Sequence, residues 1–197
     1  MRTLGLAART SLISGRREAL RRKLEGIVEP AARFVWEVGS GHGHFLTAYA
    51  TAHPDEPCIG IDIASERIAR AERKRERAQL KNLHFLQADA QDFLAAIPEQ
   101  ARIATIFILF PDPWPKRRHH KNRLIKAGFL DAAAAKSAKG AGLYFRTDHG
   151  PYFIEATATI RAHPEWVVQD SEILPFEEPT VFQKRANRYF TLVATRR

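Results

Sequence analysis

The stretch FVWEVGSGHG, residues 34–43, decides the fold, because an apolar run ends there in a glutamate and a glycine-rich turn. Further apolar runs follow at regular intervals, separated by charged segments of helical spacing. They are Cys58 to Ile63, His84 to Ala88, Ile103 to Phe110 and Leu143 to Arg146. This order predicts an α/β fold in which parallel strands are joined by crossover helices.

The C-terminal part of the chain departs from this alternation. A helix is expected from near Pro151, and then WVVQDSEI (166–173) and RYFTLVATR (188–196) form two β-rich segments joined by a polar connection. They predict an antiparallel strand pair. In the helix expected over 64–80, Ile68, Ala71 and Ala78 can face the sheet while arginines and lysines cover the rest.

Length and composition favour one domain with a basic surface. A chain of 197 residues with 45% hydrophobic content can bury one core, assigned here to residues 31–197. Residues 1–30 are basic and are expected to be either a helix on the domain or an arm that contacts RNA. The net charge of +9 and pI near 10.0 fit a phosphate-bearing partner or an ordinary soluble surface equally well.

The single cysteine, Cys58, cannot form an internal disulfide, and no Cys/His cluster has zinc-ligand spacing. Arg9 interrupts the apolar pieces near the N-terminus, so neither a signal peptide nor a membrane span is expected. We therefore expect a cytoplasmic protein without a metal. The sequence leaves monomer and homodimer equally open.

The residues that follow each apolar run are informative, because ligands of open α/β sheets bind beyond the carboxyl ends of the strands. Glu37 leads into Gly39 and Gly41, a turn that lets a ligand approach the backbone. A dinucleotide-binding turn would have glycine at position 44, where this chain has His44. The spacing instead matches the E-x-G-x-G-x-G pattern of S-adenosylmethionine-dependent enzymes.

Two further carboxylates follow the next two runs. Asp62 can accept hydrogen bonds from both hydroxyls of a ribose, and Asp89 can lie beside an adenine amino edge. Each has a structural alternative as a helix cap, and Ser65 is another candidate for the cap after Asp62.

The most specific stretch is PDPWPK, residues 111–116, where three prolines stiffen the backbone around Asp112. Trp114 is expected to act mainly as a packing plug, whereas Asp112 is expected to be functional. A basic run follows, and we expect it to bind RNA phosphates rather than form only a solvated surface. Its predicted RNA-contacting residues are Arg117, Arg118, His119, His120, Lys121 and Arg123.

The chain resembles the bacterial tRNA (guanine-N7-)-methyltransferases, class I S-adenosylmethionine-dependent enzymes, from about Phe34 to the C-terminus. The motif PDPWPKRRHHKNRL carries most of the resemblance, supported by EVGSGHG, GIDI and QADA upstream and by TD and TVFQKR downstream. It implies a seven-stranded Rossmann-like sheet, S-adenosylmethionine as cofactor and tRNA as partner. It also implies methyl transfer to N7 of a guanine, at guanine-46 of the variable loop.

The resemblance also assigns roles by position. It implies that Glu37, Asp62, Asp89 and Asp112 bind the cofactor together with the glycine turn, and that Asp112 is the active-site residue. The implied substrate contacts are Lys116, Asp148, Thr180, Val181, Phe182 and Gln183. The chain departs from the family pattern at Gln183, where the T-x-[FY]-E motif has glutamate, and at Asp62, where glutamate is frequent.

Two alternatives accompany this interpretation. One is a methyltransferase of the same fold that acts on a protein or a small molecule, with the basic run incidental. The other is a tRNA-binding relative that has lost catalysis, motivated by the neutral amide of Gln183.

Overall fold

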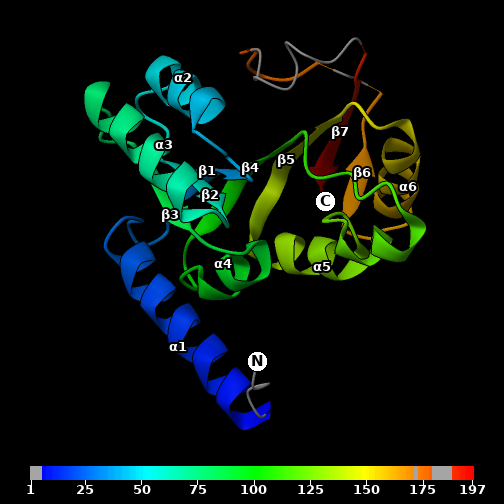
Figure 1. Ribbon diagram of the computed structural model, residues 1–197. Coiled ribbons are helices and arrows are strands. Elements are labelled where there is room, and N and C mark those ends of the chain that lie inside the picture. The colour runs from blue at the N-terminus through cyan, green and yellow to red at the C-terminus, as the bar shows by residue number, and fades with distance from the viewer. Residues whose placement is uncertain (1–5, 171–172, 179–187) are drawn as a thin grey trace.

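In the computed structural model, which describes residues 6–170, 173–178 and 188–197, the centre of the molecule is a seven-stranded sheet of order β3-β2-β1-β4-β5-β7-β6 (Figure 1). Strands β3 to β5 in this order are parallel, and β7 is antiparallel to both β5 and β6. The predicted mostly parallel sheet with an antiparallel C-terminal strand is confirmed. In chain order the strands are β1 (Arg33–Val38), β2 (Cys58–Asp62), β3 (Leu83–Gln87), β4 (Arg102–Leu109), β5 (Ser137–Thr147), β6 (Trp166–Val168) and β7 (Phe190–Arg196).

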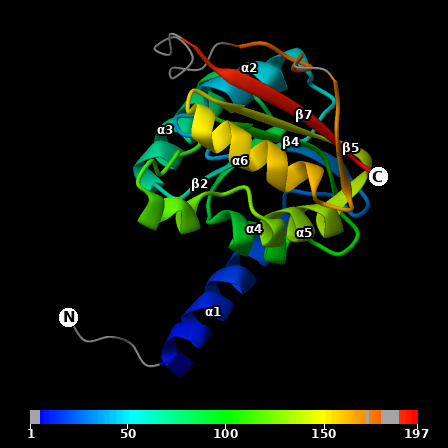
Figure 2. The same ribbon diagram turned by 90° about the vertical axis from the view of Figure 1, so that its right-hand side faces the viewer.

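Helices cover both faces of the sheet (Figures 1 and 2). One face carries α2 (His44–Ala52) and α3 (Ser65–Arg77). The other carries α4 (Ala90–Ala96), α5 (Ala127–Lys136) and α6 (Gly150–Arg161). This is the arrangement expected when each parallel strand is followed by a crossover helix.

The side chains of β1 alternate between two cores. Phe34 and Trp36 are buried in one cluster, where the Trp36 ring stacks on Phe93 with centroids 4.9 Å apart. Val35 belongs to the second cluster with Phe45. A strand buried on both faces is apolar at successive positions, which is why β1 could be predicted from the sequence.

Residues before the sheet form α1 (Leu6–Glu25). Its C-terminal half packs on α4, because Leu20 and Leu24 are buried and Arg17 Nε lies 2.7 Å from Asp92 Oδ1. The N-terminal end of α1 extends away from the sheet (Figures 1 and 2).

The prediction that Ile68, Ala71 and Ala78 of α3 face the sheet is partly wrong. Ala71 is buried and Ile68 half-buried, but Ala78 is exposed because the helix ends at Arg77. Within the described ranges, no helix combines the length and apolar character needed to cross a membrane.

Candidate active site

The strand order brings the predicted acidic residues to one edge of the sheet. Carboxyl ends of parallel strands meet at the same edge, so each residue lies beside its neighbour in the order β3, β2, β1, β4, β5. The resulting row is Asp89, Asp62, Glu37, Asp112 and Asp148.

The glycine turn between β1 and α2 is anchored to β2 and leaves open space beside it. Gly39 and Gly41 have φ of +73° and +55°, a conformation that favours glycine, and a Cβ at either position would meet nothing within 4 Å. The Gly41 amide donates to Asp62 Oδ2 at 3.1 Å. Gly43 differs, because its Cβ would lie 2.5 Å from the Phe85 ring. The turn is therefore packed against the protein at one end and accessible at the other.

Glu37 is a buried carboxyl whose hydrogen-bonding capacity is not fully used. The residue is 4% exposed, and Oε2 has no hydrogen-bond partner among the described residues. Burial, opposed by a hydrogen bond from the Leu46 backbone and assisted by the nearby charge of Asp62, raises the pKa of Glu37 to about 8. An unpaired buried oxygen is costly, so this position suits a ligand that donates a hydrogen bond or carries positive charge.

Asp62 links the glycine turn to the beginning of α3. Its Oδ1 accepts from the Ala64 amide at 2.8 Å, and Arg67 approaches Oδ2 at 3.4 Å. Neither Asp62 nor Ser65 is the N-cap of α3, because Ala64 occupies that position and Ser65 lies inside the helix. Asp62 instead ties the glycine turn to the backbone that leads into α3.

Asp89 is the N-cap of α4, where its Oδ1 accepts from the Gln91 amide at 2.8 Å. Its capping role, left open by the sequence, is confirmed. Beside it at the end of β2, Ile63 is 71% exposed, an unusual state for a large apolar side chain. Ile63 offers an apolar surface for a flat ring. In the sequence it only extends the apolar run of the buried strand, so nothing there marks it as exposed.

The loop after β4 holds Asp112 at the surface in a strained backbone. Phe110 and Trp114 both have positive φ, +52° and +45°, which bulky residues rarely adopt. The Phe110 amide donates to the Arg146 carbonyl at 2.7 Å, which fixes the start of the loop to β5. Asp112 is exposed.

Arg123, predicted from the sequence to contact RNA, instead lies inside the domain. Its side chain is 1% exposed, pairs with Glu155, and lies over the Tyr152 ring at 5.0 Å. Its Nε donates to the Pro113 carbonyl at 3.0 Å. Arg123 therefore supports the loop that carries Asp112, and it has no exposed face for a phosphate.

The rest of the basic run forms a short 3-10 helix, Arg117–Asn122, in which no residue is buried. Trp114 is half-buried with its ring 5.8 Å from that of His119, so the packing role expected for Trp114 is only partly realised. His120 lies 3.7 Å from Glu155. The exposed members of the run are Lys116, Arg117, Arg118 and Lys121.

An ion pair that sequence reasoning missed lies beside Asp148. Arg146 is buried in β5 and binds both carboxylate oxygens of Glu177, at 3.0 and 2.7 Å. This hydrogen bonding lowers the pKa of Glu177. Asp148 itself is exposed. The predicted contacts Thr180 to Gln183 lie outside the described residues.

Among the described residues, no group of three or more His, Cys, Asp or Glu side chains is placed to hold a metal ion. The open glycine turn, the unpaired Glu37 oxygen and the anchored Asp62 do fit a polar organic cofactor. These groups are therefore compatible with the S-adenosylmethionine expected from the sequence.

A family model described as "Putative methyltransferase" matches residues 31–190. Similar curated proteins include the tRNA (guanine-N(7)-)-methyltransferase of Caulobacter sp. (strain K31), 37% identical over 144 residues, which are 73% of this chain and 63% of the relative. The protein of the same name from Hyphomonas neptunium is 40% identical over 131 residues, 66% of this chain and 59% of the relative. The chain thus spans less than two thirds of the length of these relatives.

Solved structures share the fold at low identity. TrmN from Thermus thermophilus has a TM-score of 0.62 at 19% identity, covering 92% of this chain and 48% of that one. The antibiotic-resistance methyltransferase Kmr has a TM-score of 0.57 at 24% identity, covering 92% of this chain and 93% of its own. Both likenesses concern the fold alone.

Proposed function

The chain belongs to the tRNA (guanine-N7)-methyltransferase family, and from that premise we propose that it transfers a methyl group from S-adenosylmethionine to N7 of a guanine in tRNA. We assign the target as guanine-46 of the variable loop and the reaction to the cytoplasm. The observation that carries the proposal is the row of acids at the carboxyl edge, with Asp112 on a rigid loop beside the open glycine turn.

The cofactor end of the row supplies binding groups of suitable chemistry. Glu37 accepts from the amino-acid portion, and Asp62 accepts from the ribose hydroxyls. Ile63 packs against the adenine face, and the free acceptor capacity of Asp89 lies beside the adenine edge. The bound cofactor supplies an electrophilic methyl group on a positively charged sulfur.

Asp112 positions the substrate rather than removing a proton. Guanine N7 has an in-plane lone pair at neutral pH, so it attacks the methyl carbon directly while the carbon–sulfur bond breaks and its electrons stay on sulfur. The purine gains positive charge in this step. The Asp112 carboxylate offsets that charge and orients the base, so positioning and electrostatics account for the catalysis.

Asp148 and Gln183 distinguish guanine from adenine in this proposal. The Asp148 carboxylate accepts from the guanine N1 and amino groups, which adenine does not present in the same arrangement, and Gln183 contributes an amide. Asp148 follows the strand that is fixed by the Arg146–Glu177 pair, which supports a defined position for it.

The proposal is tested by incubating the purified chain with unmodified tRNA and S-adenosylmethionine, followed by nucleoside mass spectrometry. We expect 7-methylguanosine, and a guanine-46 substitution in the tRNA should abolish it. Binding of tRNA without methylation at saturating cofactor would favour the inactive relative instead. Methylation of a protein or a small molecule, with little dependence on salt, would favour the other alternative.

Removing the two exposed arginines of the 3-10 helix should weaken tRNA binding. We expect R117Q/R118Q to raise the KM for tRNA about tenfold near 0.15 M salt, because two phosphate contacts are lost. The Kd for S-adenosylmethionine should stay unchanged. The matched control is R33Q/K81Q, which removes two exposed cations at the start of β1 and beside β3, at the opposite edge of the sheet. An equal effect in both variants would contradict a local role for the loop.

A further inference from the structure

Helix α3 carries a second basic surface, separate from the loop after β4. Arg70, Arg73, Lys74 and Arg77 recur at helical spacing and therefore share one side of the helix. Arg70, Arg73 and Arg77 are exposed. Over these positions the helix rises about 10 Å, enough to follow a stretch of a polyanion.

The other cations of α3 already have carboxylate partners. Arg67 lies 3.4 Å from Asp62, and Arg75 lies 3.0 Å from Glu72. None of the four cations on the basic side makes an ion pair with any residue in the described part of the chain. The basic side is therefore distinct from the neutralised remainder of the helix.

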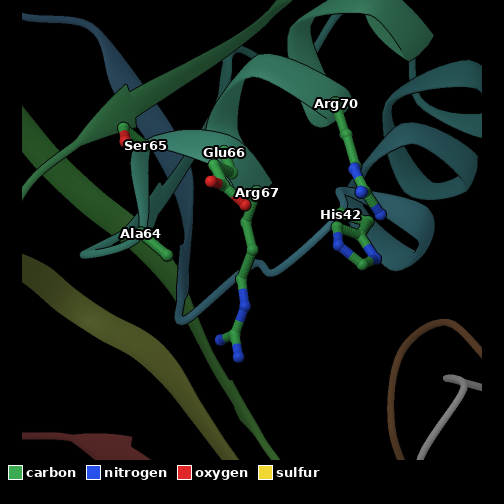
Figure 3. Close-up of a pocket in the computed structure, with 6 residues that line it drawn as sticks. All are labelled: His42, Ala64, Ser65, Glu66, Arg67 and Arg70. Carbon is green, nitrogen blue, oxygen red and sulfur yellow. The ribbon is translucent and has the colours of Figure 1, made fainter.

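This side of α3 borders a continuous shallow groove. One hollow of about 350 Å³ lies between His42 of the glycine turn and the first two turns of α3. A second, of about 360 Å³, continues to Arg77 and shares His42 and Arg70 with the first. Figure 3 shows the Arg70 side chain reaching to the His42 ring. Glu66 is the acidic residue among those lining the two hollows.

The groove carries four cations against one carboxylate, and none of the four is paired with a described residue. Lys74 Nζ is shielded from solvent and has no hydrogen-bond partner among the described residues. Burial, followed by the charge of Arg77, lowers the pKa of Lys74. A shielded ammonium group beside three guanidinium groups is costly unless an anion approaches. The groove therefore suits phosphate groups, which accept several charge-assisted hydrogen bonds.

The His42 end of the groove lies at the proposed catalytic edge. Helix α3 follows β2, and the loop with Lys116 follows β4; these strands flank β1 and its glycine turn. The two basic surfaces therefore lie on either side of the cofactor position. A nucleic acid that presents a base to Asp112 can contact both.

We propose that the groove formed by His42, Arg70, Arg73, Lys74 and Arg77 binds backbone phosphates of the RNA substrate. This inference rests on the proposed function. The contacts hold the RNA in position without reading its sequence. Together with Lys116, Arg117, Arg118 and Lys121, they extend the RNA-binding surface across both sides of the active site.

The test is the variant R70Q/R73Q/K74Q/R77Q, with His42 left unchanged because its turn belongs to the proposed cofactor site. Loss of four phosphate contacts should reduce the log-log salt slope of tRNA binding by about 3 and raise the Kd on the order of tenfold to a hundredfold near 0.15 M salt. The kcat at saturating tRNA and the Kd for S-adenosylmethionine should remain close to those of the unmodified chain.

The matched control is R33Q/K139Q/R161Q/R197Q, which removes the same charge from exposed positions outside α3 and the glycine turn. Thermal unfolding of both variants verifies folding. Equal salt slopes in the two variants would overturn the inference while leaving the proposed function intact. Failure of the unmodified chain to bind or methylate tRNA would instead contradict the proposed function. If the groove variant is unfolded, R70Q/R73Q provides the same comparison against R33Q/K139Q, with a slope change of about 1.5.

Discussion

Replacing Asp112 with alanine is expected to lower kcat for tRNA methylation by about 10²- to 10³-fold, the range found when one pre-positioned charge-stabilising group is removed. The stiff PDPWP segment and the Arg123 contact to Pro113 hold the loop in place before substrate arrives. The variant should therefore lose the carboxylate and retain the loop geometry. Single-turnover methylation with saturating cofactor and tRNA measures the effect.

The matched control for this experiment is D55A, which removes an exposed carboxylate from the connection before β2, away from the carboxyl edge. Its turnover should match that of the unmodified chain. Near-normal turnover in D112A would remove Asp112 from the active site. D112N adds a further distinction, since an amide preserves hydrogen bonding but cannot offset the charge that forms on the purine.

Replacing Glu37 with glutamine is expected to stabilise the ligand-free protein at alkaline pH and to weaken cofactor binding. Burial raises the pKa of Glu37 from its ordinary value of 4.5 to about 8, so the folded protein holds this proton more tightly than the unfolded chain does. Its contribution to stability is fully present below about pH 4.5 and is lost as the pH rises through about 8. Above that pH the neutral glutamine avoids a buried charge.

Thermal unfolding of the two proteins between pH 5 and 9 tests the first effect. Each kcal/mol gained corresponds to about 2–4 °C in Tm for a chain of this size, so a difference that grows from pH 5 and levels off above about pH 8 is readily measured. Calorimetric titration tests the effect on cofactor binding, with an expected loss of about 10- to 100-fold in affinity for S-adenosylmethionine. Parallel pH profiles together with equal affinities would refute the assignment of Glu37.

Most of the fold could be predicted because its strands are buried on both faces. Runs such as Phe34–Val38 and Ile103–Phe110 are apolar in the sequence for the same reason that they are central in the sheet. Once the strands are parallel, their ends coincide, so Glu37, Asp62 and Asp112 could be assigned to one edge before any geometry was available.

The remaining features depend on packing between distant segments. Arg123 belongs to a basic run in the sequence, yet its pairing with Glu155 depends on where α6 crosses the loop. The Arg146–Glu177 pair likewise joins residues far apart in the chain. The spacing of Arg70, Arg73 and Arg77 was visible in the sequence, but their lack of carboxylate partners among the described residues was not.

The position of β7 between β5 and β6 affects how the chain folds during synthesis. Strands β1 to β5 can pair as they leave the ribosome, since each finds a neighbour made before it or soon after it. The three residues of β6 pair with β7 and so wait until Phe190–Arg196 have been translated. Nascent chains halted before Phe190 should therefore expose the edge of β5, the strand that leads to Asp148, and depend on chaperones to avoid edge-to-edge association.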